Sequence, residues 1–152
     1  IIIVGNLTIG GTGKTPLVAY IAQELSKLGY KPGLVSRGYG GKFRETLQVT
    51  DETPVKKTGD EAQILAKLNL PFYIDKNRVR AVKTLVDNHD CDVIISDDGL
   101  QHYSMGRDIE IVLIDGKRRF GNNLTFPAGP LRESTTRLKD VDFIVNNSGP
   151  TQ

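Results

Sequence analysis

The segment from residue 8 to residue 15 constrains the fold more than any other part of the sequence. Residues 1–4 before it are a continuous β-branched run, the pattern of a strand buried on both faces. Leucine and isoleucine recur at helical spacing over residues 17–28 after it. The segment itself reads Thr-Ile-Gly-Gly-Thr-Gly-Lys-Thr, which matches the P-loop pattern except that Thr8 replaces the first glycine. Strand, glycine-rich loop and helix in this order predict the opening of a βαβ unit.

This glycine-rich loop has the composition of a phosphate site. Glycines let successive backbone N–H groups point at phosphate oxygens, and the N-terminus of the following helix adds its dipole. Lys14 would place a cation on the β- and γ-phosphates, and Thr15 would offer its hydroxyl to Mg²⁺. A glycine-rich turn without a ligand is the alternative, and the flanking strand and helix argue against it. We predict that a nucleoside triphosphate is bound by Thr8, Gly10, Gly11, Thr12, Gly13, Lys14 and Thr15.

The rest of the chain alternates between strand and helix patterns. Further strands are predicted at residues 33–36, 46–50, 72–74, 92–96, 109–114 and 141–145, and further helices at 59–68 and 76–88. This alternation predicts one α/β domain over residues 1–152, P-loop NTPase-like, with a mainly parallel sheet between two helical layers. The stretch 115–140 is rich in Gly, Pro and Arg, and a loop of that length in a compact domain is usually functional.

Two acidic pairs are candidates for chemistry. Asp97 and Asp98 follow a Val/Ile strand, which is where P-loop enzymes carry a carboxylate for Mg²⁺, although Asp-Gly is also a common turn pair. Asp60 and Glu61 open a predicted helix. These carboxylates could simply interact favourably with the dipole at the helix N-terminus, or they could serve as a general base and a Mg²⁺ ligand. The residues alone do not separate these two interpretations.

Several cations lie in loops rich in Gly or Pro. Arginine in such loops suits anionic substrate groups or charge that develops in a transition state, although each one taken singly fits an ordinary solvated surface. The imidazole of His102, five residues after Asp97, suits contact with phosphate or substrate, or a turn cap, while His89 at a helix end suits a structural role. The loop cations are Arg37, Lys42, Arg118, Arg119 and Arg132.

Composition narrows the function classes. The net charge of +2 gives no argument for nucleic acid or an anionic membrane. A single cysteine, Cys91, excludes an intrachain disulfide. No apolar run approaches the roughly 20 residues that span a bilayer. Because the sequence begins inside a strand pattern without an initiator Met, we expect it to be a piece of a longer protein.

Seven motifs, in order along almost the whole chain, resemble the tetraacyldisaccharide 4'-kinase family, the lipid A 4'-kinases of Gram-negative bacteria. The two most specific are Asp-Asp-Gly-Leu-Gln-His at 97–102 and Pro-Ala-Gly-Pro-Leu-Arg-Glu at 127–133. The family commonly has Ser or Thr where this chain has Thr8. Ala62 is a departure, because the family usually has Pro after the Asp-Glu pair. The other motifs are residues 5–16, 36–39, 59–61, 114–116 and 120–122.

The resemblance implies ATP-dependent phosphorylation of the 4'-hydroxyl of a lipid A disaccharide precursor, with Mg²⁺, at the cytoplasmic face of the bacterial inner membrane. It implies Asp60 as catalytic base, Glu61, Asp97 and Asp98 near the metal and nucleotide, and Lys14 on the phosphates. It also implies a membrane-anchoring helix before residue 1 and a further lobe after residue 152, while this piece itself would be soluble. Neither nucleic acid nor an obligate protein partner is implied. The residues expected to line the cleft are Arg37, Tyr39, His102 and Arg132.

Two other functions are compatible with the P-loop. One is a nucleotide switch of the partitioning or metallochaperone type. Partitioning ATPases carry an extra Lys early in the loop, where this chain has Ile9, and a metallochaperone would need more Cys or His ligands than one Cys and two His. The other is a regulatory domain that binds nucleotide without catalysing a reaction. The two acidic pairs at the positions expected for a kinase argue against it.

Overall fold

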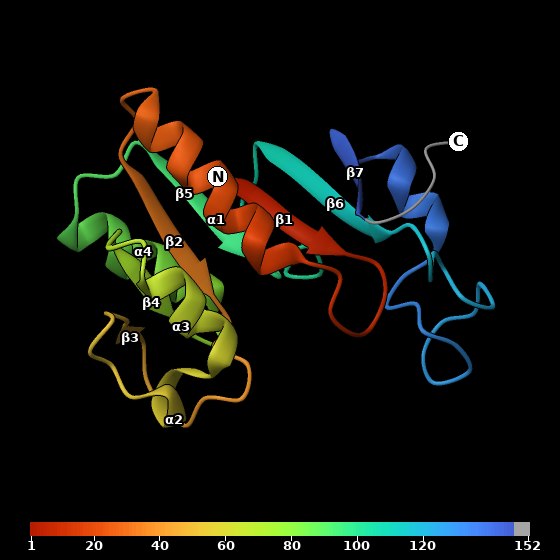
Figure 1. The fold of residues 1–152 in the computed structure, drawn as a ribbon, viewed down its shortest axis with the longest axis horizontal. Helices are drawn as coiled ribbons and strands as arrows, with labels where there is room; N and C mark the ends of the chain where they lie inside the picture. The colour runs from red at the N-terminus through yellow and green to blue at the C-terminus, as the bar shows by residue number, and fades with distance from the viewer. Residues whose placement is uncertain (148–152) are drawn as a thin grey trace.

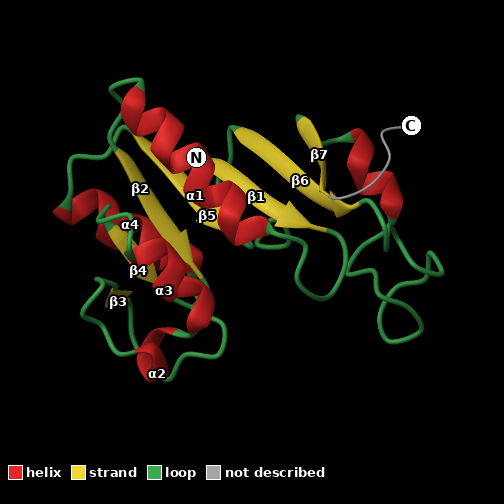
Figure 2. Ribbon diagram, viewed as in Figure 1, coloured by secondary structure: helices red, strands yellow, loops and turns green. Residues whose placement is uncertain are grey.

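The computed structural model describes residues 1–147 as a seven-stranded sheet between helices (Figures 1 and 2). The strand order is β3-β4-β2-β5-β1-β6-β7, and every neighbouring pair is parallel except β3 and β4. This confirms the predicted P-loop NTPase-like α/β fold. The strands are β1 (Ile2–Asn6), β2 (Pro32–Ser36), β3 (Leu47–Gln48), β4 (Phe72–Ile74), β5 (Val93–Asp97), β6 (Ile109–Asp115) and β7 (Phe143–Asn147).

Helices cover both faces of this sheet. In the view of Figure 1, α1 (Lys14–Lys27) and α3 (Asp60–Ala66) lie in front of the sheet, and α4 (Arg78–Asn88) lies behind it. Successive strand side chains point to opposite faces, which explains the division. Val4, Leu34 and Ile95 pack with α1 and α3, while their chain neighbours Ile3, Val35 and Ile94 belong to clusters on the other face. The continuous Val/Ile runs are therefore buried on both sides.

The structure corrects the predictions for two segments. A short helix α2 (Val55–Thr58) precedes α3, and Gly59 with φ 84° separates the two, so the predicted helix 59–68 is shorter than expected. The predicted long loop contains a 3-10 helix, η1 (Thr135–Lys139). No helix within residues 1–147 is long and apolar enough to cross a membrane.

The last strand lies two residues later than the predicted 141–145. Asp142 meets β6 just before the ladder: its carboxylate accepts a hydrogen bond from the backbone N–H of Glu110 (2.7 Å), and its own backbone N–H donates to the carbonyl of Glu110 (3.1 Å). The parallel ladder to β6 then begins at Phe143 and continues through Asn147. The polar run Asn-Asn-Ser-Gly-Pro at 146–150 predicts a loop that leaves a strand. Asn146 and Asn147 are instead strand residues, and the rest of that run, 148–150, lies outside the described residues.

Candidate active site

The P-loop connects β1 to α1 and presents backbone donors at the helix start. Gly10 (φ 105°) and Gly13 (φ 86°) adopt left-handed conformations that favour glycine. No side chain caps α1, so the first N–H groups of the helix are available to an anion. The side chain of Asn6, at the end of β1, holds the loop from beneath by donating to the hydroxyl of Thr12 (3.1 Å) and the carbonyl of Gly10 (3.4 Å).

The first turn of α1 meets the two aspartates that follow the central strand β5. The hydroxyl of Thr15 donates to Oδ2 of Asp97 at 3.1 Å. The ammonium of Lys14 lies 3.6 Å from Oδ1 of Asp98 and is itself largely buried. The structure thus brings together P-loop residues and aspartates that lie more than 80 residues apart in the sequence, at the carboxyl edge of the sheet where ligands bind in open α/β folds.

Asp97 is a buried carboxyl with one unused oxygen. Its exposed fraction is 2%, and burial raises its pKa to about 6, against the lowering effects of Lys14 and Thr15 and with further increases from Asp98 and Glu61. Within the described residues, Oδ1 of Asp97 has no hydrogen-bond partner. A buried carboxylate oxygen without a partner is costly unless a ligand satisfies it, so Asp97 is a residue that could hold a cation.

Asp98 is directed into the cleft instead. It has φ 55°, a strained conformation for a residue other than glycine, and such strain concentrates at functional sites. Oδ1 of Asp98 accepts a hydrogen bond from Arg132 (2.8 Å). The backbone N–H of Arg132 donates to the carbonyl of Leu7 (2.6 Å), and Ile9 donates to the carbonyl of Pro130 (2.8 Å). The segment that carries Arg132 therefore runs along the start of the P-loop.

A cleft of roughly 600 Å³ opens beside Asp98. All four residues that the resemblance placed in a cleft lie on its wall. Four cationic side chains face one carboxylate, which suits an anionic ligand. Three apolar or aromatic residues stand at the same wall and are 43–78% exposed. The lining residues are Ile9, Arg37, Tyr39, Lys76, Arg78, Asp98, Gln101, His102, Phe126 and Arg132.

His102 is an uncharged polar group in this cleft. Partial burial lowers its pKa, and the positive charges of Arg78, Arg107 and Arg37 lower it further. Nε2 of His102 and the hydroxyl of Ser104 are 3.1 Å apart. The imidazole is therefore neutral at neutral pH and available as a hydrogen-bond donor or acceptor.

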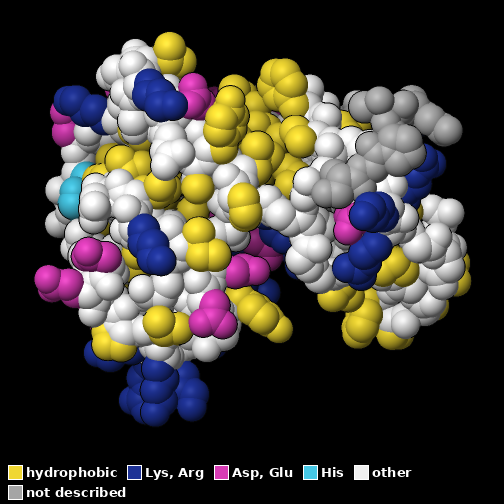
Figure 3. Space-filling model, viewed as in Figure 1, with side chains coloured by type: hydrophobic (Ala, Val, Ile, Leu, Met, Phe, Trp, Pro, Cys, Tyr) yellow, Lys and Arg dark blue, Asp and Glu magenta, His cyan; other side chains and the backbone are white. Residues whose placement is uncertain are grey.

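Asp60 and Glu61 stand exposed on the first turn of α3 and line a second hollow of about 460 Å³. Tyr39 lines both this hollow and the main cleft, so the two border each other. In Figure 3 the surface is hollowed between the α2–α3 region and the long loop after β6, and acidic side chains gather on the α3 side. A side chain at Gly59 would collide with the carbonyl of Tyr39 (2.1 Å), so glycine is required there.

The structure adds three residues that the sequence did not single out: Lys76, Arg78 and Gln101. The guanidinium of Arg78 is buried and donates to the backbone carbonyl of Asp98 (2.9 Å). The amide of Gln101 donates to the carbonyl of Asn6 (3.1 Å), and its oxygen accepts from Arg132 (3.3 Å). Lys76 and Arg78 follow β4, and the rule that parallel strands present their carboxyl ends at one edge places them at this site only once β4 is known to pair with β2.

The remaining loop cations, Arg118, Arg119 and Lys42, lie in different places. Arg118 and Arg119 line a small cavity of about 90 Å³ against Thr8 and Thr12 of the P-loop. Arg118 approaches Gly10 so closely that a Cβ there would lie 3.3 Å from its Nη1. Lys42 lines neither this cavity nor the main cleft. His89 donates to or accepts from the hydroxyl of Tyr73 (3.1 Å) at the far end of α4, which fits the structural role predicted for it.

Replacing Asp75 with Asn should destabilise the protein by about 2 kcal/mol at neutral pH. This buried carboxylate fixes the start of α4, and therefore Arg78, by accepting from the N–H of Asn77 (2.8 Å) and from Arg80 (2.6 Å). Burial alone would raise the pKa of Asp75, but hydrogen bonds from Arg80, Thr46 and Asn77 outweigh it and lower the pKa.

Since the folded pKa of Asp75 lies below the unfolded one, the stabilisation is complete above the unfolded pKa of about 4 and is lost as pH falls through the folded pKa. Urea unfolding at several pH values should show that the difference in free energy of unfolding between Asp75→Asn and the unaltered protein shrinks in acid. Asp87→Asn, on the exposed face of α4, is the matched control and should change little. An equally large gap at pH 2 would contradict this assignment.

Comparison with known proteins matches this chain to one protein family. The family model for tetraacyldisaccharide-1-P 4'-kinase matches residues 1–152. A tetraacyldisaccharide 4'-kinase of Shewanella frigidimarina is 53% identical over 153 residues, which cover 100% of this chain and 46% of that protein. One of Ruthia magnifica is 55% identical over 151 residues, 98% of this chain and 48% of that protein.

A solved structure, LpxK from Aquifex aeolicus in complex with ATP, matches 97% of this chain and 47% of its own with a TM-score of 0.86 and 32% identity. This chain therefore spans about half the length of the curated relatives it matches. The part that it spans includes the P-loop, the aspartates and the cleft described above.

Proposed function

The chain belongs to the tetraacyldisaccharide-1-P 4'-kinase family, and from this membership we propose that it is the nucleotide-binding part of a kinase that phosphorylates the 4'-hydroxyl of a tetraacyldisaccharide 1-phosphate in lipid A biosynthesis. The observation that carries the proposal is the contact of Lys14 with Asp98 (3.6 Å), which stands between the P-loop and the basic cleft. A phosphoryl donor at the loop and an anionic acceptor in the cleft would meet at these two side chains.

The donor in this proposal is ATP. The glycine amides of the P-loop and Lys14 hold its phosphates, and the hydroxyl of Thr15 lies where a P-loop enzyme holds Mg²⁺. The residues fit Mg²⁺, because carboxylate oxygen is a hard ligand and Asp97 keeps one buried oxygen without a partner while its other oxygen accepts from Thr15. Mg²⁺ held there by Thr15 and Asp97 would neutralise negative charge that develops during transfer.

Asp97, more than Asp98, is the carboxylate that fits the metal. Asp98 is already engaged by Arg132 (2.8 Å) and Lys14. Within residues 1–147, no three His, Cys, Asp or Glu side chains gather closely enough to hold a metal by themselves. Mg²⁺ needs only one or two carboxylates when substrate phosphates and water complete its shell, so Thr15 and Asp97 suffice. Glu61 would contribute its negative charge without contacting the ion.

The acceptor in this proposal is an anionic lipid sugar. Arg37, Arg78 and Arg132 offer guanidinium groups suited to phosphate, and the neutral imidazole of His102 suits a sugar hydroxyl. Ile9 and Phe126 are exposed at the same wall and suit acyl chains. The proposed partner is therefore a lipid A disaccharide precursor, met at the cytoplasmic surface of the inner membrane, with neither nucleic acid nor an obligate protein partner.

Asp60 is the proposed general base. It would accept the proton of the 4'-hydroxyl while that oxygen attacks the γ-phosphorus, the bond to the β-γ bridging oxygen breaks, and ADP leaves. Its place in a hollow that borders the cleft at Tyr39 supports this role. Arg132, through its contact with Asp98, lies where it can stabilise charge on the transferring group.

The proposal is tested with the full-length parent protein and γ-labelled ATP. We expect the label to move to disaccharide 1-phosphate, with little release as inorganic phosphate. A P-loop switch ATPase is the alternative, and it would release labelled phosphate in response to a partner protein without labelling the lipid. A parent that binds ATP and never turns over would instead support a regulatory domain.

A further inference from the structure

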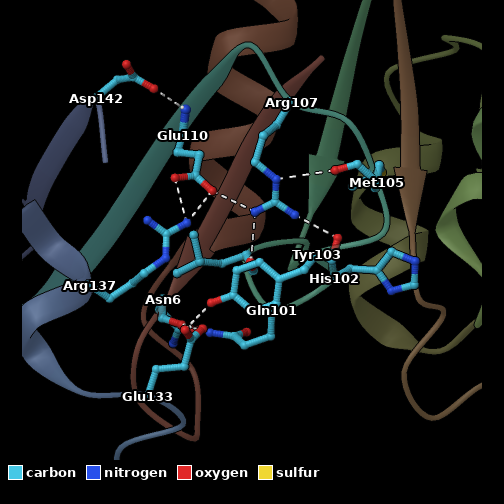
Figure 4. A network of polar contacts seen from close by, with 11 residues as sticks. Asn6, Gln101, His102, Tyr103, Met105, Arg107, Glu110, Glu133, Arg137 and Asp142 are labelled. Carbon is cyan, nitrogen blue, oxygen red and sulfur yellow. Dashed lines mark hydrogen bonds and ion pairs between the residues drawn. The ribbon is translucent and has the colours of Figure 1, made fainter. Parts of the chain in front are cut away.

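A buried ionic network lies next to the loop that carries the cleft residue His102 (Figure 4). Glu110 on β6 is its centre, with a side chain only 8% exposed. Nη1 of Arg107 donates to Oε1 of Glu110 (2.6 Å), and Nη2 of Arg137 donates to both oxygens of Glu110 (2.5 and 2.7 Å). Two guanidiniums thus share one carboxylate, one from the loop after β5 and one from η1.

Arg107 also holds the loop that carries His102. Its guanidinium donates to the backbone carbonyls of His102 (2.7 Å), Leu100 (3.0 Å) and Met105 (3.3 Å). The loop from residue 99 to residue 106 therefore closes around a single planar side chain. Arginine offers five N–H donors in a rigid fork, whereas lysine offers three on one atom and cannot reach all these acceptors together.

Tyr103 joins this loop to the segment that carries Arg132. Its ring lies under the guanidiniums of Arg107 and Arg137, with centroid distances of 5.3 and 5.9 Å. Its hydroxyl donates to the carboxylate of Glu133. Tyr103 immediately follows His102, and Glu133 immediately follows Arg132, so each partner of this contact is the chain neighbour of a residue on the cleft wall.

We propose that Arg107, braced by Glu110 and Arg137, is a positioning residue that sets where His102 and Arg132 stand relative to each other at the acceptor. None of the three network residues lines the cleft. They act through Tyr103, Glu133 and the carbonyl of His102. The inference rests on the proposed function for the identity of the acceptor, and on the network geometry for the coupling.

A role limited to stability fits this network poorly. Desolvating two guanidiniums and the carboxylate that they share costs free energy that well-packed apolar side chains would avoid. Apolar side chains would not, however, direct three backbone carbonyls or connect two catalytic loops through hydrogen bonds. What this arrangement provides is a fixed orientation of the two loops, and phosphoryl transfer depends heavily on orientation.

The test compares Arg107→Lys and Arg107→Met with the unaltered full-length parent protein. We expect both to lower kcat/KM for the disaccharide acceptor by about 10- to 100-fold, while the Kd for ATP changes less than about threefold. In His102→Ala, adding Arg107→Lys should cost little further activity, because residues that act as a unit are not additive. Lys83→Met, on the exposed face of α4, is the control for general loss of a cation.

Hydrogen exchange keeps the network testable apart from the function. In Arg107→Lys, amides of residues 99–106 and 131–137 should exchange faster together, while α1 keeps its protection. Acceptor kinetics equal to wild type in Arg107→Lys would overturn the inference, as would equal losses in ATP binding and acceptor use that follow the melting temperature. If the unaltered parent shows no transfer at all, the proposed function fails, and independent exchange of the two segments would then overturn the coupling as well.

Discussion

Asp97→Asn should make the ligand-free protein more stable at neutral pH and at the same time remove most of its phosphoryl transfer. Burial raises the pKa of Asp97 from 3.8 to about 6, so the folded state binds a proton more tightly than the unfolded state does. Above pH 6 the folded protein therefore holds an unfavourable charge, at a cost of up to roughly 3 kcal/mol for a two-unit shift. The amide of asparagine carries no charge and avoids this cost.

The sign of the effect depends on pH. Stability from protonating Asp97 is complete below about pH 4 and is lost as pH rises through the folded value of about 6. Urea unfolding should thus give a higher free energy of unfolding for Asp97→Asn than for the unaltered protein at pH 7.5, and the difference should vanish near pH 4. Transfer to the acceptor should fall by roughly a hundredfold or more, the scale for losing one preorganised charge.

Asp98→Asn is the matched control for this result. Its carboxylate is more exposed and is paired with Arg132 and Lys14, so its loss should not stabilise the fold. An Asp97→Asn protein that is less stable than wild type at pH 7.5 would contradict the account of a buried carboxylate awaiting a cation.

Asp60→Asn should lower kcat by about a thousandfold while leaving the Kd for ATP within about twofold. The reason is that Asp60 is exposed on α3, in a hollow that contains none of the P-loop residues, so its loss removes proton acceptance without disturbing phosphate binding. The measurement pairs single-turnover transfer with fluorescent-nucleotide binding on the same preparation. Asp51→Asn, an exposed turn carboxylate, should behave as wild type. Turnover retained within tenfold by Asp60→Asn would show that another group takes the proton.

The parts of the fold that sequence predicts well are those with local causes. The β-branched run before the P-loop, the glycines within it and the periodic helix after it each follow from neighbouring residues, and all three stand as expected in β1 and α1. The sequence left open which of Asp97 and Asp98 would contact Mg²⁺, but the direction of the Asp97 side chain has a local cause. Asp97 lies two residues after Ile95, so strand alternation directs both toward α1 and Thr15.

The parts that sequence does not predict depend on pairings between distant segments. Arg78 reaches the cleft because β4 is placed next to β2, and nothing in residues 76–78 alone indicates that neighbour. The start of β7 is set by its register with β6, where Asp142 precedes the ladder. The network around Glu110 joins segments 27 residues apart, and charged residues at such positions look like ordinary solvated surface until the fold buries them.

The most direct test of the central claim is where the phosphate goes. The full-length parent, ATP and Mg²⁺ are incubated with disaccharide 1-phosphate, and the product is examined by phosphorus–proton correlation NMR. We expect a second phosphomonoester coupled to the proton on carbon 4', and no product from the 4'-deoxy disaccharide. A phosphate on any other hydroxyl, or ATP consumed at the same rate with and without the disaccharide, would contradict that claim.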